Sequence, residues 1–510
     1  MSSSIRVRFA PSPTGGLHLG GVRTVLYNYL FAKKHGGRFV LRIEDTDQSR
    51  FVPGAEEYIM DCLRWCGIEP DESPEKGGPF APYRQSERKP YYRAYAEQLV
   101  AAGRAYYAFD TPAELEEMRI RFRTADNPSP QYDHRLRMDM RNSISLEKAE
   151  WERLLAEGHP YVIRIKMPAD QELVFHDMIR GEVRFNTGIV DDKVLLKQDG
   201  MPTYHLAVVV DDHAMEITHA FRGEEWLPSA PVHILLWEWL GWKEVMPAWA
   251  HLPLILKPDG NGKLSKRDGD RLGFPVFAMN WTDPRTGEYT QGFRERGFLP
   301  EAFVNLLAML GWNDGSGKEL FSMPELIDAF SMDRVHKGGA KFDYEKARWF
   351  NHEWIKVSSA DRLLPDVKAV LEKEGIEVND DAYTKNVISL VKERCTLLTD
   401  FVEQSAYFFR RPATPDMSPV AAKWSPEKTA FFQSLIPALE AAETLSAGEL
   451  ETIFKNLAAE KAIKVGELQL PFRLMLVGGK FGPAVFEIAA TIGRGETVAR
   501  IRQGLAALGQ

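Results

Sequence analysis

Cysteine is scarce in this chain: among 510 residues only Cys62, Cys66 and Cys395 occur. An odd and sparse set excludes a disulfide-stabilised secreted fold and is typical of a reducing compartment. No stretch approaches the ~20 apolar residues that a membrane-spanning helix needs, and the N-terminal residues show no targeting pattern. We therefore expect a cytoplasmic protein without membrane contact.

An excess of positive charge is also missing, since the formal net charge is −8. Nucleic-acid-binding domains are usually basic, so any such surface here must be a local patch. The chain is 44% hydrophobic and 27% charged, which is ordinary for globular proteins. At this length the composition predicts several domains, each with a core of its own.

The first fifty residues predict a β-loop-α-β unit that opens a parallel sheet. A β-like run covers residues 5–9, and prolines and glycines then interrupt regular structure. Over residues 21–34 the apolar side chains follow the i, i+3, i+4 pattern of a half-buried helix. A second β-like run covers residues 39–43.

The later parts of the chain differ in their pattern of apolar and charged residues. Charged helical stretches and a strand at 162–167 predict an inserted domain between about residues 100 and 203. The apolar run 206–210 predicts a return to the parallel sheet, because buried parallel strands are continuously apolar. Helical periodicity over 381–409 and 435–457 predicts an α-helical C-terminal third.

One segment between the first strand and the first helix has the chemistry of an anion site. A strand ends, glycines let the backbone approach a ligand, and a helix N-terminus directs its N–H groups at an anion. His18 lies at the start of that helix and could donate to a phosphate oxygen; taken alone, it would rather be a surface histidine. The segment comprises Pro11, Ser12, Pro13, Thr14, Gly15, Gly16, Leu17, His18, Leu19, Gly20 and Gly21.

A second candidate is a basic loop flanked by glycines. A flexible loop of this kind can place cations beside a triphosphate, although by itself it could be a solvated surface loop. It is not a Walker loop, because Lys263 is followed by leucine instead of serine or threonine. Its residues are Lys263, Leu264, Ser265, Lys266 and Arg267.

These two segments resemble the HIGH and KMSKS signatures of class I aminoacyl-tRNA synthetases, and they stand in the order of that class. The segments 42–47, 83–88, 202–207 and 222–226 resemble further signatures of glutamyl enzymes. Glutaminyl enzymes usually carry Glu and Asn at the positions of Ser12 and Thr14, and they are expected to have C-terminal β-barrels. The chain therefore resembles the bacterial glutamyl-tRNA synthetase family.

The resemblance implies an α/β catalytic domain with a Rossmann-like parallel sheet, an inserted α+β domain and an all-α anticodon-binding region. The expected ranges are 1–100 and 204–255 for the catalytic domain, 101–203 for the inserted acceptor-binding domain, 256–325 for the KMSKS-loop and stem-contact region, and 326–510 for the anticodon-binding domain.

The resemblance also implies an activity: ATP-dependent activation of L-glutamate, with Mg²⁺, and transfer to tRNA(Glu) by a monomer. Arg222 is the expected partner of the substrate side-chain carboxylate, since guanidinium and carboxylate match in geometry. Singly, Arg222 and Glu44 could also be structural ion-pair residues. The implied residues are His18, Lys263 and Lys266 for catalysis; Arg8, Ala10, Ser12, Glu44, Tyr204 and Arg222 for glutamate; and His18, Gly20, Glu225 and Lys266 for ATP.

For tRNA, the resemblance places Arg394 where enzymes restricted to tRNA(Glu) carry an arginine that reads the third anticodon base. The alternative is a contact to backbone phosphate. Val208 departs from relatives that carry Asn beside the substrate. Some members hold zinc in the inserted domain, but this chain has no cysteine between Cys66 and Cys395, so we expect no protein-bound zinc.

Three alternatives share much of this pattern. A glutaminyl or non-discriminating synthetase would differ in the amino acid or tRNA it accepts. A tRNA-modifying glutamyl transferase would lack the helical C-terminal region. A non-catalytic tRNA-binding paralogue should have lost His18 or the loop 263–267, and both are present.

Overall fold

The computed structural model describes residues 4–413 and 415–509 and divides into two compact units. The N-terminal unit comprises residues 1–295 and 303–344, and the C-terminal unit comprises 296–302 and 345–510. The boundary after residue 344 differs from the one expected at 325. Helix α11 (Met323–Ala329) packs on α1, and the Phe330 ring packs against the Tyr27 ring at a tilted angle, so this segment completes the N-terminal unit.

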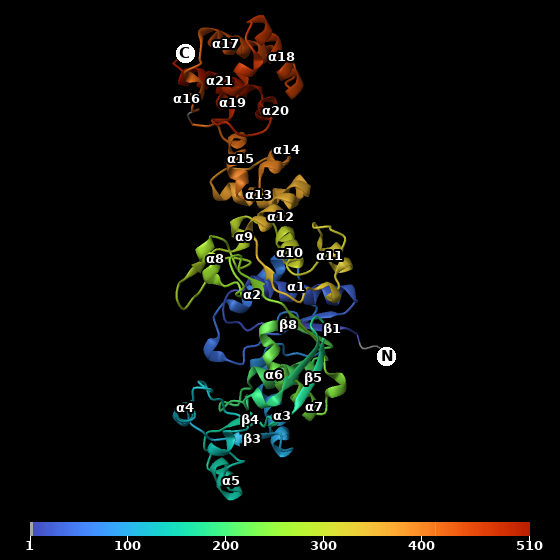
Figure 1. Ribbon diagram of the computed structural model, residues 1–510. Coiled ribbons are helices and arrows are strands. Elements are labelled where there is room, and N and C mark those ends of the chain that lie inside the picture. Colours follow the sequence, from blue (N-terminus) through green and yellow to red (C-terminus); the bar gives the residue numbers. More distant parts are fainter. Residues whose placement is uncertain (1–3, 414, 510) are drawn as a thin grey trace. The chain divides into compact units, whose positions relative to one another are not determined.

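A six-stranded sheet forms the centre of the N-terminal unit (Figure 1). All neighbouring strands pair in parallel except β5 and β6, which form an antiparallel hairpin. The predicted, mostly parallel α/β sheet is thus confirmed. In sheet order the strands are β2 (Arg38–Leu41), β1 (Arg6–Phe9), β8 (His219–Gly223), β9 (Ala248–Leu252), β5 (Glu172–Asp177) and β6 (Gly181–Asn186).

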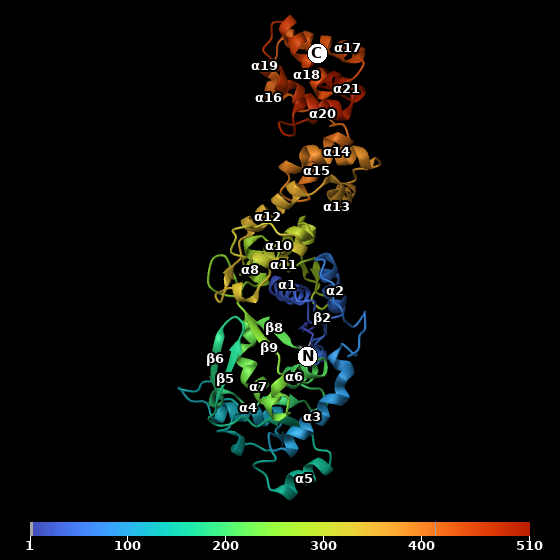
Figure 2. The same ribbon diagram turned by 90° about the vertical axis from the view of Figure 1, so that its right-hand side faces the viewer.

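Helices cover both faces of this sheet. Helix α1 (Leu19–Lys34) connects β1 to β2 and packs on β1, β2 and β8, which confirms the predicted β-loop-α-β unit. Its apolar positions, such as Val22, Val25 and Leu26, are fully buried, as the periodicity required. Helices α6 (Tyr204–Ala214) and α7 (Ala230–Trp239) lie on the opposite face (Figure 2).

The strand expected at 206–210 was wrong, because these residues lie within helix α6 (Tyr204–Ala214). Residues 206–210 are all buried, and α6 packs against α7, β7 and helix α3 (Lys89–Ala101). A helix covered on all sides needs no polar face, so a short apolar run cannot be distinguished from a buried strand by periodicity. The return to the sheet is made by β8 instead.

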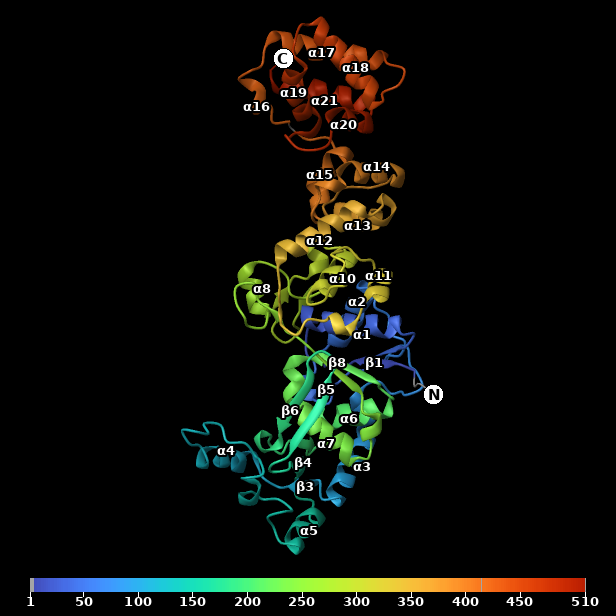
Figure 3. The ribbon, with the colours of Figure 1, turned by 45° about the vertical axis from the view of Figure 1, so that its right-hand side comes forward.

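The segment between residues 101 and 203 is divided between two sheets. Strands β3 (Ala105–Ala108), β4 (Val162–Ile165) and β7 (Val194–Leu196) form a separate three-stranded sheet, and β4 confirms the strand expected there. Helices α4 (Pro112–Arg121) and α5 (Lys148–Ala156) belong to the same region. The β5–β6 hairpin, however, joins the central sheet beside β9 (Figure 3). The inserted segment therefore contributes two strands to the central sheet.

Smaller elements complete the N-terminal unit. Cys62 and Cys66 are buried in and just after α2 (Ala55–Trp65), and burial raises the pKa of Cys62 to about 12. None of the described helices is long and apolar enough to cross a bilayer. The elements are α2 (Ala55–Trp65), β10 (Ile255–Leu256), α8 (Lys266–Leu272), β11 (Trp281–Thr282), β12 (Tyr289–Thr290), α9 (Phe293–Arg296), α10 (Pro300–Met309) and β13 (Ala340–Lys341).

The C-terminal unit is α-helical, as predicted, and its described residues share one large apolar core. The helical pattern over 381–409 is nevertheless interrupted at residues 392–399. There the Asp400 carboxylate accepts the backbone N–H groups of Thr396 and Leu397 at 2.8 and 2.9 Å, which holds the turn that leads into the next helix. The principal helices are α12 (Tyr344–Val357), α13 (Ala360–Lys373), α14 (Asp381–Val391), α15 (Asp400–Phe409), α17 (Pro426–Ala441), α18 (Ala447–Glu460), α19 (Val465–Val477), α20 (Val485–Ile492) and α21 (Arg494–Ala507).

The pattern over 435–457 is also two helices, because Ser446 and Glu449 form a capping box that starts α18. Elsewhere in this unit the buried Asn351 side chain joins three segments. Its Oδ1 accepts from Leu299 N at 2.8 Å, and its Nδ2 donates to the carbonyls of Gly297 and Thr396 at 3.2 and 2.7 Å.

We expect Asn351→Ala to lower the free energy of unfolding of the C-terminal unit by about 1–3 kcal/mol, because buried backbone groups lose their partner. Calorimetry of the full chain measures this. Asn386→Ala is the matched control, since Asn386 is exposed on α14 and should change stability by less than about 0.5 kcal/mol. Equal effects of the two substitutions would contradict the assigned role.

Candidate active site

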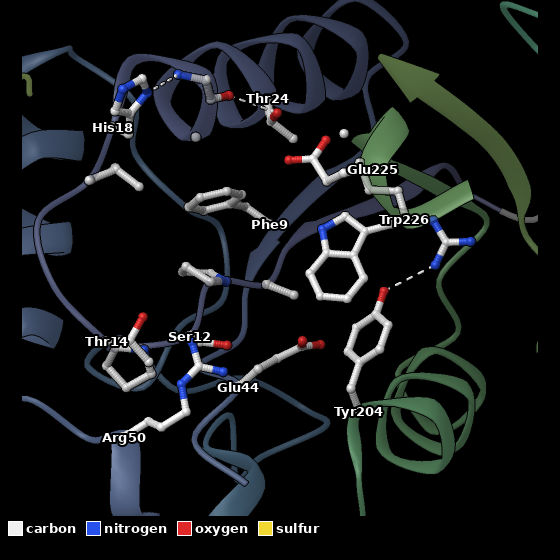
Figure 4. A pocket seen from close by; sticks show the side chains of 18 of the residues that line it. Phe9, Ser12, Thr14, His18, Thr24, Glu44, Arg50, Tyr204, Glu225 and Trp226 are labelled. Atoms are coloured by element: carbon white, nitrogen blue, oxygen red, sulfur yellow. Dashed lines mark hydrogen bonds between the residues drawn. The ribbon is translucent and has the colours of Figure 1, made fainter. Parts of the chain in front are cut away.

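A cavity of about 940 Å³ lies at the carboxyl ends of β1 and β8 (Figure 4). This is the edge at which open parallel sheets usually bind their ligands. It is formed by the loop after β1, the segment after β2, the start of α6, the end of β8 and the loop before α8. All six residues expected to bind the amino acid line it: Arg8, Ala10, Ser12, Glu44, Tyr204 and Arg222.

Arg222, at the end of β8, is held from three sides. Its Nε donates to His251 Nε2 at 2.9 Å, and its Nη1 donates to Tyr204 Oη at 3.0 Å and to His233 Nδ1 at 3.1 Å. Its Nη2 is buried and has no hydrogen-bond partner among the described residues. No carboxylate pairs with Arg222 in the described part of the chain, so a cationic donor is left for an anionic ligand.

Arg8 and Glu44 belong to a buried ion cluster at the same end of the sheet. Arg8 bonds Asp212 through two nitrogens, each at 3.1 Å. Arg42 donates to Asp212 at 2.8 Å and to Glu44 at 3.1 Å. The structural ion-pair interpretation therefore holds for Glu44 and not for Arg222, although Glu44 also faces the cavity (Figure 4).

His18 stands at the N-terminus of α1 on another side of the cavity. Its Nδ1 accepts a long hydrogen bond of 3.4 Å from Gly20 N, and its Nε2 is buried and has no partner among the residues that the structure describes. Burial, and then the charge of Lys263, lowers the pKa of His18 to about 4. Since the imidazole is neutral at pH 7 with Nδ1 accepting, the proton lies on Nε2. His18 can thus donate to an anion at the helix N-terminus.

The basic loop is held by two carboxylates. Lys263 pairs with Glu225 at 2.6 Å at the cavity, and Lys266, the first residue of α8, pairs with Glu288 at 2.7 Å. Lys263, Leu264 and Ser265 line the main cavity, as do Gly20 and Glu225. Lys266 lines a neighbouring cavity of about 340 Å³ instead. The main cavity thus gathers every predicted ATP residue except Lys266.

Several residues of the site were missed by sequence reasoning. Trp226 faces the cavity, and its ring centroid lies 4.5 Å from that of Tyr204 (Figure 4). It follows Glu225 in the segment 222–226, so its place in that motif could have predicted that it lies at the site. His233, His251 and Asp177, which lie behind Arg222, gave no sequence signal of their own, because only the fold brings them together.

The sheet, the anion site at α1 and the basic loop define a class I aminoacyl-tRNA synthetase. The family model "tRNA synthetases class I (E and Q), catalytic domain" matches residues 4–349, and the model "Anticodon binding domain" matches residues 357–505. Glutamate–tRNA ligases from Flavobacterium johnsoniae and Amoebophilus asiaticus are 52% and 50% identical to this chain. They cover 100% and 99% of it, and the chain covers 100% and 98% of them.

Solved structures agree with these matches. The crystal structure of a glutamate tRNA ligase from Elizabethkingia meningosepticum in complex with its amino acid has a TM-score of 0.93 and 50% identity, over 99% of this chain and 100% of that one. The glutamate-tRNA synthetase from Elizabethkingia anophelis gives a TM-score of 0.90 at 50% identity, with the same coverage of both chains. The chain belongs to the glutamate–tRNA ligase family.

We expect His18 to remain neutral, with its proton on Nε2, from pH 8 down to about pH 5, and to titrate near its folded-state pKa of about 4. NMR of the labelled imidazole against pH measures both the tautomer and the midpoint. In Lys263→Ala the midpoint should rise, because the nearby positive charge is removed. A wild-type midpoint near the ordinary value of 6.5 would contradict the described environment.

Proposed function

We propose that this chain activates L-glutamate with ATP and transfers the glutamyl group to the 3′ end of tRNA(Glu). The α-carboxylate of glutamate attacks the α-phosphorus of ATP, pyrophosphate leaves, and glutamyl-adenylate forms. A terminal ribose hydroxyl of the tRNA then attacks the activated carbonyl, and AMP leaves. The observation that carries the proposal is the unpartnered Arg222 Nη2 in the same cavity as the anion site at His18.

The amino-acid end of the cavity suits glutamate. Arg222 is a cation without a carboxylate partner among the described residues, and its burial strengthens any ionic hydrogen bond. A glutamine amide would gain less from such a donor. Glutamyl and non-discriminating enzymes would share this feature, and the choice between tRNAs rests on other residues.

The ATP end relies on positioning and charge, which is how most phosphoryl chemistry is catalysed. His18 Nε2 would donate to a phosphate oxygen, and the dipole of α1 favours negative charge at the same place. Lys263 and Lys266 would exchange Glu225 and Glu288 for phosphate. Both ion pairs are partly exposed and such pairs contribute little free energy, so the exchange costs little.

Mg²⁺ is proposed to arrive on the triphosphate, because this ion usually binds proteins through substrate phosphates and one or two carboxylates. Glu225 is the carboxylate that we propose to contact this Mg²⁺, since it lines the cavity and interacts with Lys263. Zinc is not part of the proposal: all three cysteines are buried, and none lies in the inserted segment.

We propose further that Arg394 takes part in tRNA choice. It lies in the 3₁₀ turn Lys392–Arg394 between α14 and α15, within the residues matched by the anticodon-domain model. Its side chain is exposed and makes no hydrogen bond or ion pair within residues 4–413 and 415–509. A free, exposed cation in this domain supports either a base contact or a phosphate contact.

We expect Arg222→Gln to raise the KM for glutamate roughly 10- to 100-fold, because a hydrogen bond to a charged group is lost. The KM for ATP should stay nearly unchanged. Glutamate-dependent pyrophosphate exchange measures both, and the melting temperature reports on folding. An unchanged glutamate KM in the folded variant would refute the role of Arg222. Exchange by the wild type that depends on glutamine and not on glutamate would refute the proposed substrate.

For tRNA choice, we expect the wild type to charge tRNA(Glu) and to reject tRNA(Gln), and Arg394→Gln to narrow that difference by about 1–3 kcal/mol. Parallel aminoacylation of both tRNAs measures this. Arg502→Gln is the control, since Arg502 is exposed in the same unit and paired with Glu440. If Arg394 contacts phosphate, its loss should weaken both tRNAs alike and reduce the salt slope by about one.

A further inference from the structure

We infer that Asp177 and His251 are positioning residues that determine which N–H groups of Arg222 are offered to the substrate. The inference rests on the proposed function, because it concerns recognition of the glutamate side chain. Neither residue lines the cavity. Both would act only through Arg222, from behind.

Both carboxylate oxygens of Asp177 accept hydrogen bonds from N–H groups. Its Oδ1 accepts from the backbone N–H groups of Ile179 and Arg180, each at 2.9 Å. Its Oδ2 accepts from the backbone N–H of His251 at 3.1 Å and lies 2.6 Å from His251 Nδ1. Burial alone would raise the pKa of Asp177, but the hydrogen bonds from His251, Arg180 and Ile179 bring it below its usual value. Asp177 is therefore a charged acceptor on both oxygens.

A charged acceptor at Nδ1 determines the tautomer of His251. The proton must lie on Nδ1, where it is donated to Asp177, because Asp177 has no donor of its own. Burial lowers the pKa of His251 and keeps the ring neutral. The lone pair of Nε2 is then free to accept, and it does so from Arg222 Nε at 2.9 Å. The opposite tautomer would place two N–H groups against each other.

The same logic continues on the other side of Arg222. Arginine only donates, so His233 Nδ1 must accept from Arg222 Nη1, and the His233 proton lies on Nε2, which is 3.3 Å from His205 Nδ1. Three of the five guanidinium N–H groups are thus used by His251, His233 and Tyr204. The two on Nη2 remain, buried and unpartnered among the described residues. Contact with a carboxylate through two guanidinium nitrogens is excluded while these bonds persist; Nη2 alone is presented.

The network is built across three neighbouring strands. Arg222 on β8 stands opposite His251 on β9, and Asp177 at the end of β5 stands opposite Trp249 on β9. The Trp249 ring centroid lies 5.1 Å from the Arg222 guanidinium carbon. Strand β5 comes from the inserted segment, so this insertion supplies a group that positions the amino-acid pocket. A one-residue slip in register would turn these side chains to the other face.

Two substitutions at His251 separate its two hydrogen bonds. The Asn amide reaches the position of Nδ1, so His251→Asn can keep the bond to Asp177 but offers Arg222 no acceptor. The Gln amide reaches the position of Nε2, so His251→Gln can still accept from Arg222. We expect His251→Asn to raise the glutamate KM roughly ten-fold or more, and His251→Gln to raise it clearly less. The ATP KM should stay within about two-fold of wild type for both.

A double-mutant cycle decides whether His251 acts through Arg222. In the Arg222→Gln background, His251→Asn should produce no further rise in glutamate KM. Asp177→Asn should by itself raise the glutamate KM when Arg222 is present and not in the Arg222→Gln background, because an amide in place of Oδ1 or Oδ2 faces donors. Asp192→Asn is the matched control: Asp192 is equally buried, accepts from Tyr106, Arg137 and Met167 N, and does not line the cavity.

The readouts are glutamate-dependent pyrophosphate exchange and the melting temperature of the full chain. Asp192→Asn should lower the melting temperature without changing the glutamate KM. The inference is overturned if wild type uses glutamate but folded His251→Asn has the wild-type glutamate KM, or if His251→Asn acts equally with and without Arg222. If His251→Asn does not fold, Asp177→Asn takes its place: a wild-type glutamate KM in folded Asp177→Asn then overturns the inference. A glutamate KM in His251→Gln that is raised as much as in Asp177→Asn overturns it as well. Absence of glutamate-dependent exchange in wild type that is supplied with tRNA(Glu) overturns the proposed function first.

Discussion

The buried cluster of Arg8, Arg42, Glu44 and Asp212 is the interaction on which the active site depends. It joins the first strand, the segment after the second strand and helix α6, and its two cations and two carboxylates are nearly inaccessible to water. Such a cluster is weak evidence for stability in itself, but loss of one member leaves an uncompensated buried charge, which costs about 3–5 kcal/mol. Because the two positive and two negative charges must stay paired, the cluster fixes the positions of Arg8 and Glu44 in the cavity wall.

The central sheet places two different kinds of donor at one edge. At β1 the chain turns into α1, and His18 lies at the N-terminus of this helix with its Nε2 facing no partner among the described residues. At β8 it ends at Arg222, which neighbouring strands hold in a fixed orientation. A neutral imidazole at a helix N-terminus and a buried guanidinium thus line the same cavity.

The loop 263–267 differs from the surroundings of Arg222 in how easily its ion pairs can be broken. Its two lysines form partly exposed ion pairs with Glu225 and Glu288, whereas Arg222 is bound to uncharged, buried acceptors. Breaking an exposed ion pair costs little free energy, whereas breaking a buried hydrogen-bond network costs much more. The structure therefore combines a buried network that fixes Arg222 with a basic loop whose ion pairs are partly exposed.

Much of the site could be predicted from local sequence. The strand, glycine-rich turn and helix of residues 5–34 lie close together along the chain, and their periodicity and turn residues specify them directly. The same holds for the basic loop and for the helical C-terminal region. The run 206–210 marks the limit, because a helix buried on every side and a buried strand have the same apolar composition.

Only the tertiary structure decided how Arg222 is held. By sequence alone, the residue types of the pocket and the order of its motifs were determined, and with them the class of chemistry. The pairing of β8 with β9 and of β9 with β5 brings together Arg222, His251 and Asp177, which are separated by 29 and 74 residues along the chain. Strand pairing over such separations depends on global packing of the sheet, and no local pattern encodes it.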